Sequence, residues 1–237
     1  MISAASGMKA RMESLDMLAN NLANAQTAGF KSDQEFYGLF EDELPVIEKQ
    51  WTDFSQGLLT GTGNPLDLAL SGDGFFAVTA PNGVLYTRNG AFEISKTNRL
   101  QTRDGYMLRN VLDDGKPIEV DASQSVDIDE NGVVSQGGQP IGQIEIVTPA
   151  NSRTRGMGKL GNSYFALSNL ADAGPTASDT ENQPYVRQGF LEQANVPVAG
   201  SAVRLVSVMR QFEMLQKALA VGADMNKAVN TIASTTA

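Results

Sequence analysis

The strongest constraint on the fold of this chain is a pair of apolar stripes, one at each end of the sequence. Over the first 25 residues, apolar side chains recur at alternating steps of four and three, the spacing of a coiled-coil seam. These residues, called the Met seam below, are Met1, Ala5, Met8, Met12, Leu15, Ala19 and Leu22. The spacing predicts a helix that ends between Asn24 and Gly29, because asparagines lower helix propensity and a glycine suits a left-handed cap.

The second stripe lies near the C-terminus and predicts a longer helix from about Ser201 to Ser234. Its members also alternate at steps of three and four, and are Leu205, Val208, Phe212, Leu215 and Leu219. The stripe resumes beyond Gly222 with a small phase slip, at Met225, Val229 and Ile232. We therefore expect a long helix with a weak point at Gly222.

Between the two stripes the pattern is that of β-structure. Turn-forming dipeptides recur at hairpin spacing, at Asn82-Gly83, Asp104-Gly105, Asp114-Gly115, Asn131-Gly132 and Gly137-Gly138. The runs with strand-like composition are 66–70, 75–78, 92–94, 125–128, 144–147, 164–167 and 185–186. Many of them alternate between apolar and polar residues, which favours antiparallel strands with one solvated face. The predicted fold class is thus α+β, with terminal helices that form a coiled-coil-like element and a central, mostly antiparallel β domain.

The predicted organisation has five segments. They are a helix with its following loop (1–34), a connector (35–65), a β domain (66–185), a return connector (186–200) and a C-terminal helix (201–237). Residues 1–34 hold three basic and three acidic side chains, residues 201–237 hold four and two, and the region between holds 11 and 22. Nearly neutral, striped ends on an acidic body indicate an assembly element attached to a solvated domain.

Composition narrows the possible functions. The chain has no cysteine and no histidine, which excludes Ser-His-Asp triads, Cys-His pairs, Cys/His zinc sites and CxxC redox chemistry. Its net charge of −9 argues against nucleic acid and anionic lipid as partners. No apolar run of about 18 residues occurs, and charged side chains interrupt the first 22 residues, so we expect neither membrane insertion nor a cleaved signal peptide.

Two short motifs resemble ligand sites but lack residues that such sites require. Residues 127–132 (Asp-Ile-Asp-Glu-Asn-Gly) open like a calcium loop, yet the twelfth position is Gly138 instead of a bidentate Glu. We expect a type I′ hairpin turn at Asn131-Gly132 in its place. Residues 156–159 (Gly-Met-Gly-Lys) lack the first glycine and the Ser/Thr of a phosphate loop. We expect no catalytic, metal or cofactor site, although a carboxylate enzyme stays open as an alternative because spatial distances are invisible in a sequence.

The two stripes admit two interpretations. The helices could pair within one chain or pack on the β domain, or they could pack on other copies of the chain. Stripes that reach nearly to both ends, rich in Ala and Met, favour the second interpretation. A β-type binding module with helical oligomerisation ends is a further alternative.

At residues 19–31 the chain resembles the N-terminal signature of the bacterial flagellar rod and hook proteins. The signature positions are Asn20, Asn21, Leu22, Asn24, Thr27, Gly29, Phe30 and Lys31. Similar blocks follow in family order at 64–70, 72–76, 86–92 and 189–196, and at Arg210, Phe212, Glu213, Asp224 and Met225. The resemblance covers essentially the whole chain, and residues 110–185 are its least diagnostic part.

The resemblance implies a structural subunit without an active site. Its terminal helices would pair around a channel while the β domain forms the outer wall of a helical tube. Implied partners are copies of itself, other flagellar rod and hook subunits, and the flagellar type III export apparatus; the implied location is the periplasm-spanning rod of the basal body. The short segment from Phe40 to Phe54 is most like the proximal-rod branch. A distal-rod or hook subunit is the alternative within the family.

The residues expected to form the assembly interface are apolar members of the two stripes. They are Met8, Met12, Leu15, Leu22, Leu205, Val208, Phe212, Leu215 and Leu219, which should bury against one another within and between subunits. Asn20, Asn21 and Asn24 either hydrogen-bond neighbouring backbones in the rod or simply mark the end of the helix.

Overall fold

The computed structural model describes residues 2–38, 46–148, 157–161, 163–167 and 184–235. The chain divides into two compact units, each made of separate stretches of sequence. Unit 1 comprises residues 1–24, 33–53 and 196–237, and unit 2 comprises 25–32 and 54–195. The chain thus enters and leaves the β-rich unit more than once, as a discontinuous fold requires.

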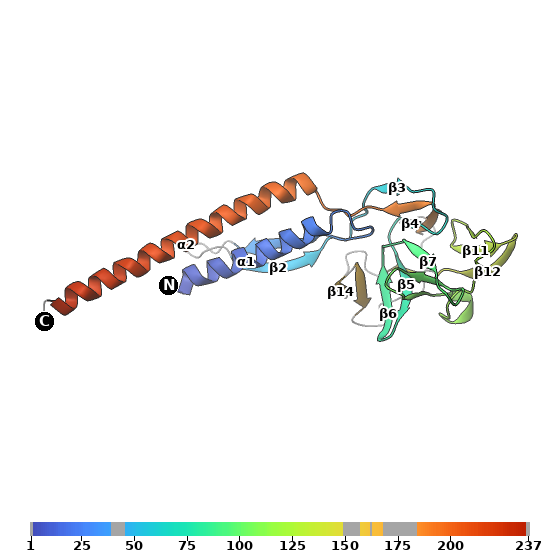
Figure 1. Ribbon diagram of the computed structural model, residues 1–237, viewed down its shortest axis with the longest axis horizontal. Helices are drawn as coiled ribbons and strands as arrows, with labels where there is room; N and C mark the ends of the chain where they lie inside the picture. The colour runs from blue at the N-terminus through green and yellow to red at the C-terminus, as the bar shows by residue number, and fades with distance from the viewer. Residues whose placement is uncertain (1, 39–45, 149–156, 162, 168–183, 236–237) are drawn as a thin grey trace. The chain divides into compact units, whose positions relative to one another are not determined.

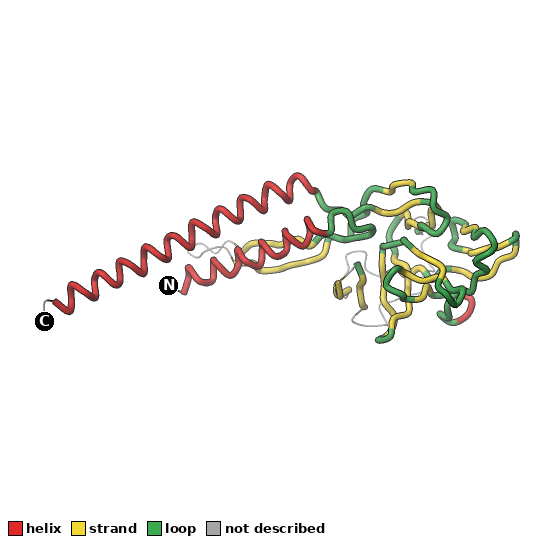
Figure 2. Tube along the Cα trace, viewed as in Figure 1, coloured by secondary structure: helices red, strands yellow, loops and turns green. Residues whose placement is uncertain are grey.

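Unit 1 consists of two helices and a hairpin. Its elements are α1 (Ile2–Ala23), β1 (Asp33–Gly38), β2 (Val46–Thr52) and α2 (Val198–Thr235). The two helices lie side by side, and the antiparallel hairpin β1–β2 contacts α1 (Figure 1). A register shift between Phe36 and Tyr37 marks a bulge in this hairpin. Figure 2 shows the same arrangement of helices and strands along the chain trace.

Unit 2 is a β fold in which every strand pairing is antiparallel. Its strands are β3 (Leu59–Gly61), β4 (Leu68–Ser71), β5 (Phe75–Ala80), β6 (Gly83–Thr87), β7 (Phe92–Ile94), β8 (Leu100–Thr102), β9 (Met107–Leu108), β10 (Asp127–Ile128), β11 (Val133–Gln136), β12 (Gln139–Gln143), β13 (Ile146–Val147), β14 (Met157–Gly161), β15 (Tyr164–Leu167), β16 (Tyr185–Gln188) and β17 (Phe190–Glu192). A short 3-10 helix, η1 (Val111–Asp113), follows β9. The main sheet has the order β14-β15-β6-β5-β9-β8-β7, and β13 pairs with β5.

Smaller sheets complete unit 2. Strands β10, β11 and β12 form a meander, β16 pairs with β4, and β17 pairs with β3. The last two pairings join segments far apart in the sequence, because β16 and β17 belong to the returning chain. The main core includes Phe76, Val78, Leu100 and Leu108, all almost completely buried. A second cluster gathers Phe75, Phe165 and Phe54, whose rings pack edge-on or tilted.

The predicted fold class is confirmed at the level of two terminal helices and a mostly antiparallel central β domain. All seven strand-like runs contain or overlap a strand. Helix α1 ends at Ala23 and α2 begins at Val198, three residues before the expected start. Helix α2 continues through Gly222, so the phase slip there does not interrupt it.

Three expectations from the sequence need correction. The stretch 35–65, expected as a loop-like connector, holds most of β1 and all of β2 and β3, while the return stretch 186–200 holds most of β16, β17 and the start of α2. The strands β1 and β2 carry charged and amide side chains among their apolar ones, so they lack the regular apolar/polar alternation that marks a strand in a sequence. The start of β16 was expected, at 185–186. The second expected loop stretch, 168–184, lies outside the described residues except for Pro184.

The third correction concerns a turn. Asn131 is not among the residues with positive φ, and Gly132, at φ 77°, donates its backbone N–H to the Asp129 carbonyl. The loop is therefore a type I turn followed by a left-handed glycine instead of type I′. The Asp129 carboxylate accepts the backbone N–H groups of Asn131 and Val133, which gives it a role in the turn itself. Both central residues of the Gly137-Gly138 turn have positive φ, as type I′ requires.

Candidate assembly surfaces

The two helices of unit 1 pack through a small apolar cluster. Met17 and Leu18 of α1 and Val208 of α2 are buried in it, and Leu15 and Leu205 pack against them. The cluster is much smaller than the core of unit 2, and so each helix keeps a large part of its surface outside it.

Two members of the predicted stripe of α2, Leu205 and Val208, belong to this cluster. Val208 is buried, and Leu205, Phe212, Leu215 and Leu219 are half-buried, whereas most neighbouring positions on the helix are exposed. We call these five residues the inner seam of α2. Its three- and four-residue spacing places them on one side of the helix.

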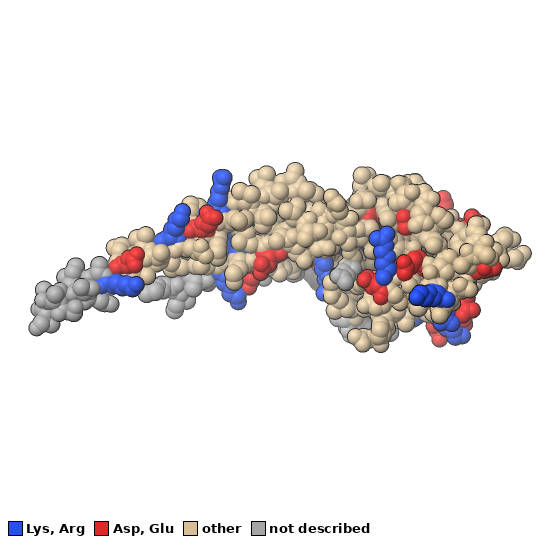
Figure 3. Space-filling view, in the orientation of Figure 1, with Lys and Arg blue, Asp and Glu red and all other residues tan. Residues whose placement is uncertain are grey.

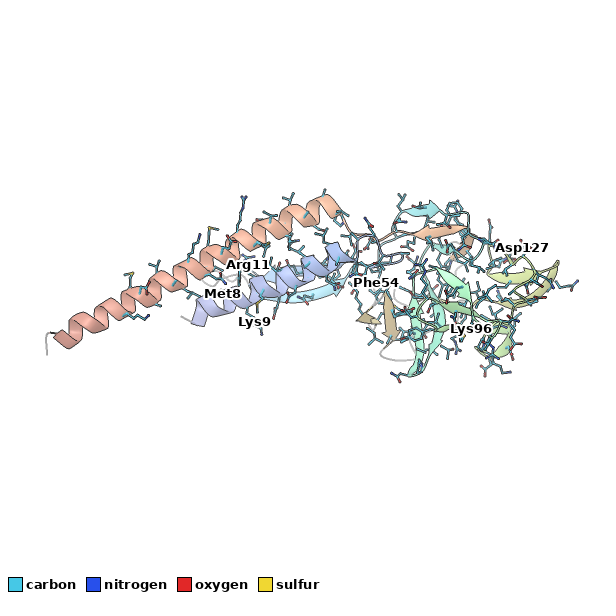
Figure 4. All side chains as sticks on the ribbon, viewed as in Figure 1. Met8, Lys9, Arg11, Phe54, Lys96 and Asp127 are labelled. Atoms are coloured by element: carbon cyan, nitrogen blue, oxygen red, sulfur yellow. The ribbon has the colours of Figure 1, made fainter. Side chains whose placement is uncertain are left out.

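Helix α1 buries a different face from the Met seam. Its buried side chains are Ala10, Ser14, Met17, Leu18 and Asn21, with Gly7 buried at the same side. Within the Met seam, Met8, Leu15 and Leu22 are half-buried, Ala19 is exposed and Met12 is 54% exposed. At about 100° per residue, the centres of the two faces are separated by more than a quarter turn. Figure 4 labels Met8 on α1 together with the charged Lys9 and Arg11.

Polar contacts explain why α1 buries this face. Ser14 donates its hydroxyl to Oε1 of Glu35 on β1 over 2.7 Å, and Arg204 of α2 donates to the same oxygen over 3.0 Å. Glu35 therefore ties together α1, α2 and the hairpin. Because the hairpin was not expected from the sequence, the partners of Ser14 could not be foreseen.

Asn21 has a structural partner within its own chain. Its side-chain amide donates to the Asp33 carbonyl over 2.7 Å, and its oxygen accepts the Asp33 N–H over 2.9 Å. This pair of bonds fixes the start of β1 against the end of α1. Asn20 is exposed, and Asn24 donates its side-chain amide to the Asn20 carbonyl over 2.9 Å.

A second apolar stripe runs along α2 on the side away from the inner seam. We call it the outer stripe; its members, all at least half exposed, are Val203, Val206, Met214, Val221 and Met225. At about 100° per residue they fall within about a third of the helix circumference, centred nearly opposite the inner seam. A helix that is apolar on two opposite sides is typical of one buried between neighbours.

Charged side chains interrupt the outer stripe without covering it. Arg210 and Lys217 lie on the same side of α2 at a seven-residue spacing, and both are exposed. On the visible face of the molecule, basic and acidic side chains are interspersed over each unit (Figure 3). This surface carries no field of a single sign of the kind that tracks nucleic acid.

The loop part of the signature lies in unit 2. Thr27 accepts the backbone N–H of Phe30 through its carbonyl, and Gly29 has a φ of 66°. A Cβ on Gly29 would lie 2.3 Å from the backbone carbon of Arg88, so only glycine fits. Phe30 is buried beneath the ammonium of Lys159, which lies 4.0 Å from the ring centroid.

Lys31, the last signature residue, is completely buried in an ionic cluster. Its Nζ lies 2.6 Å from Oε1 of Glu192, and Arg88 donates to Oε2 of the same carboxylate over 3.1 Å. Glu192 and Arg88 were not expected as site residues, although both lie within blocks that carry the resemblance. The sequence shows that Arg88 and Glu192 are charged, but it does not show that they form an ion pair.

In the part of the chain that the structure describes, no group of three or more acidic side chains has the geometry to hold a metal ion. Neither described helix combines the length and the hydropathy that a membrane span needs.

Three known protein families match separate segments of the chain. "Flagella basal body rod protein" matches residues 1–31, "Flagellar hook protein FlgE/F/G D1 domain" matches 69–136, and "Flagellar basal body rod FlgEFG protein C-terminal" matches 187–232. The flagellar basal-body rod protein FlgG of Borreliella burgdorferi is 33% identical over 97% of this chain and 96% of the relative. The rod protein FlgF of Caulobacter vibrioides is 32% identical over 90% and 89%, and FlgG of Bacillus subtilis is 31% identical over 90% of both chains.

Proposed function

The chain belongs to the flagellar basal-body rod and hook protein family and is a structural subunit of the basal body, not an enzyme, and we propose that it polymerises through its terminal helices into the axial tube of the rod. In this proposal the tube transmits torque and encloses the export channel.

The observation that carries the proposal is the unequal exposure of apolar side chains. Among the described residues, nine of the fourteen exposed large apolar side chains belong to unit 1, although unit 2 is the larger unit. Five of these nine form the outer stripe of α2, and Met12 lies in the Met seam of α1. Contiguous exposed apolar surface of this kind marks a protein interface.

We propose that the two sides of the helices have different tasks. The inner seam of α2 and Leu15 hold the helix pair together within a subunit, as a coiled-coil-like element. The outer stripe, with Met8, Met12 and Leu22 of the Met seam, packs on neighbouring subunits. The outer stripe of α2 and the exposed part of the Met seam on α1 differ from each other, so the contacts between subunits are heterologous. In this proposal the contacts repeat without closing into a ring, which builds a helical tube.

The position in the rod is the finer part of the proposal. The relatives named above are called rod proteins, and each is aligned over about nine-tenths of its length or more, which supports a rod subunit of ordinary size. We propose the proximal-rod type, with a distal-rod or hook subunit as the alternative. Further partners in the proposal are the other rod and hook subunits and the type III export apparatus, which would export the chain without cleaving a signal peptide.

The experiment is to replace the resident copy of the gene with variants and to isolate basal bodies. Met214→Glu introduces a charge into the outer stripe. Leu112→Glu is the matched control because the Leu112 side chain in unit 2 is similarly exposed, at 68% against 62% for Met214. We expect peptides of the wild type and of the control in basal bodies, and at least a tenfold loss for Met214→Glu. Full incorporation of Met214→Glu would contradict the proposal.

A further inference from the structure

Unit 2 is built from two stretches of chain that meet at one buried ionic cluster. Lys31 belongs to the short N-terminal stretch, whereas Arg88 and Glu192 belong to the long one, and 161 residues separate Lys31 from Glu192. The side chains of Lys31 and Glu192 are 0% exposed and that of Arg88 is 2% exposed. We call these three residues the closing cluster.

Glu192 is the hub of the closing cluster. Its Oε1 accepts from Lys31 Nζ over 2.6 Å and from the Gly57 backbone N–H over 2.8 Å, and its Oε2 accepts from Arg88 over 3.1 Å. Its backbone carbonyl also accepts the Gly29 N–H over 2.7 Å. One residue near the C-terminal end of unit 2 thus contacts three other segments of the unit.

The neighbouring Asn195 makes a second set of links between the same segments. Its side-chain oxygen accepts the Ser32 N–H over 2.7 Å, and its amide donates to the carbonyl and the hydroxyl of Ser55 over 3.1 Å each. Lys31 also donates to the Ser55 carbonyl over 2.6 Å. Segments 29–32, 54–57 and 190–195 are therefore held together where the chain passes between units 1 and 2 in sequence.

The burial of Lys31 and Arg88 depends on the charge of Glu192. Two cations share one carboxylate, and a buried cation without a nearby anion is strongly destabilising. Arg88 is held in place by the Gly72 carbonyl, over 2.7 Å, and by the ring of Phe75, so it is fixed within the β unit. The carboxylate of Glu192, which pairs with both Lys31 and Arg88, offsets part of the free-energy cost of burying the two cations.

We infer that Glu192 is a lock for unit 2: residues 190–195 complete the unit by supplying the carboxylate that pairs with both Lys31 and Arg88, and without this segment the whole unit stays open. The lock makes the fold of the β unit depend on the last part of its sequence. In a chain that is threaded from its N-terminus, unit 2 would close only after residue 192 has emerged. That consequence rests on the export proposed above, whereas the lock itself does not.

The test is amide hydrogen exchange of the full-length chain with Glu192→Gln, Lys31→Met and the control Glu119→Gln, which breaks the exposed ion pair between Glu119 and Arg99. For a lock, exchange rises together across unit 2, including β5 and β8, by about 100-fold in Glu192→Gln. Lys31→Met leaves the Arg88–Glu192 pair, and so its effect is smaller, about tenfold. The control should stay within about twofold of wild type.

Other results would overturn the inference. Faster exchange confined to residues 29–32 and 190–195, with β5 and β8 unchanged, would make the cluster a local clamp. An effect of Lys31→Met equal to or larger than that of Glu192→Gln would show that the carboxylate is not the hub. If Glu192→Gln is unfolded throughout unit 2, the lock is supported, and the milder Lys31→Met variant still tests the order of the effects.

Discussion

Phe76, Val78 and Leu108 in unit 2 are completely buried, whereas Val203, Met214 and Met225 in unit 1 are each more than 60% exposed. The two units contain similar kinds of apolar residue, but unit 2 buries these side chains whereas unit 1 leaves many of them exposed. Unit 2 surrounds its apolar side chains with its own strands. The closing cluster joins the two stretches of chain that make up this unit. Among the described residues of unit 1, the buried apolar cluster is a narrow strip between the helices, and we propose that the exposed apolar side chains outside it pack on further subunits.

The largest expected effect is a difference in stability between charged substitutions on the two faces of α1. Leu15→Glu places a charge in the cluster between α1 and α2, so we expect unit 1 to lose about 3 kcal/mol and α1 amides to exchange freely. Met12→Glu, at an exposed position, should keep that protection. Hydrogen exchange by mass spectrometry checks both variants, and unit 2 should be unchanged in each. Equal loss of protection in the two variants would contradict a division of α1 into an inner and an outer face.

The next effect concerns unit 2 alone. Gly29→Ala forces a Cβ into the backbone of Arg88 at a positive φ, and we expect a loss of about 2–3 kcal/mol in the free energy of unfolding. Gly138→Ala is the control, because Gly138 also has a positive φ but faces open space. It should cost about 1 kcal/mol. Urea unfolding of the full chain measures both, and equal losses would mean that the contact with Arg88 is unimportant.

A smaller effect is expected at the junction of α1 and β1. Asn21→Ala removes two hydrogen bonds to the backbone of Asp33 and should destabilise unit 1 by about 2 kcal/mol. Asn20→Ala, at an exposed position, should change stability by less than about 0.5 kcal/mol. Exchange rates of β1 and α1 amides report the difference. The reverse order would indicate that Asn20 is the residue that matters in the free subunit.

The smallest effect is a pH dependence confined to unit 2. Burial raises the pKa of Tyr164 well above its ordinary value of 10, with a further increase from its hydrogen bond to Asp104. The folded chain therefore keeps this proton where the unfolded chain loses it. The stabilisation is complete below about pH 10 and declines as the pH rises further.

Tyr164→Phe tests this dependence because phenylalanine does not titrate. Its unfolding free energy should fall less steeply than that of wild type between about pH 9 and about pH 11. Urea unfolding at several pH values, followed by circular dichroism, gives the two slopes. Identical slopes would show that Tyr164 does not carry the alkaline sensitivity.

The parts of the fold that could be predicted from the sequence are those that depend on local patterns. The turn at Gly137-Gly138 and the inner seam of α2 both follow from residue spacing within one element. The hairpin β1–β2 and the buried face of α1 depend on each other, because polar Ser14 and Asn21 become buried only against the residues of β1. A rule based on apolar spacing misses a face in which the polar residues Ser14 and Asn21 interrupt the apolar ones.

The closing cluster illustrates the same limit at longer range. Lys31 was expected as a member of the signature, but its partner lies 161 residues away. Arg88 and Glu192 are ordinary charged residues in a sequence, and only the strand pairings β3–β17 and β4–β16 bring the returning chain beside the start of unit 2. Long-range ion pairs of this kind follow from the topology, which a single sequence does not specify.

The most direct test of the difference between the two units is hydroxyl-radical footprinting of the free full-length chain and of the same chain in isolated basal bodies. We expect Met12, Val203 and Met214, which are exposed in the free subunit, to lose most of their reactivity on assembly, while Leu112 in unit 2 stays reactive. Equal labelling of Val203 and Met214 in the free and assembled states would contradict the claim that the outer stripe of α2 is an interface between subunits.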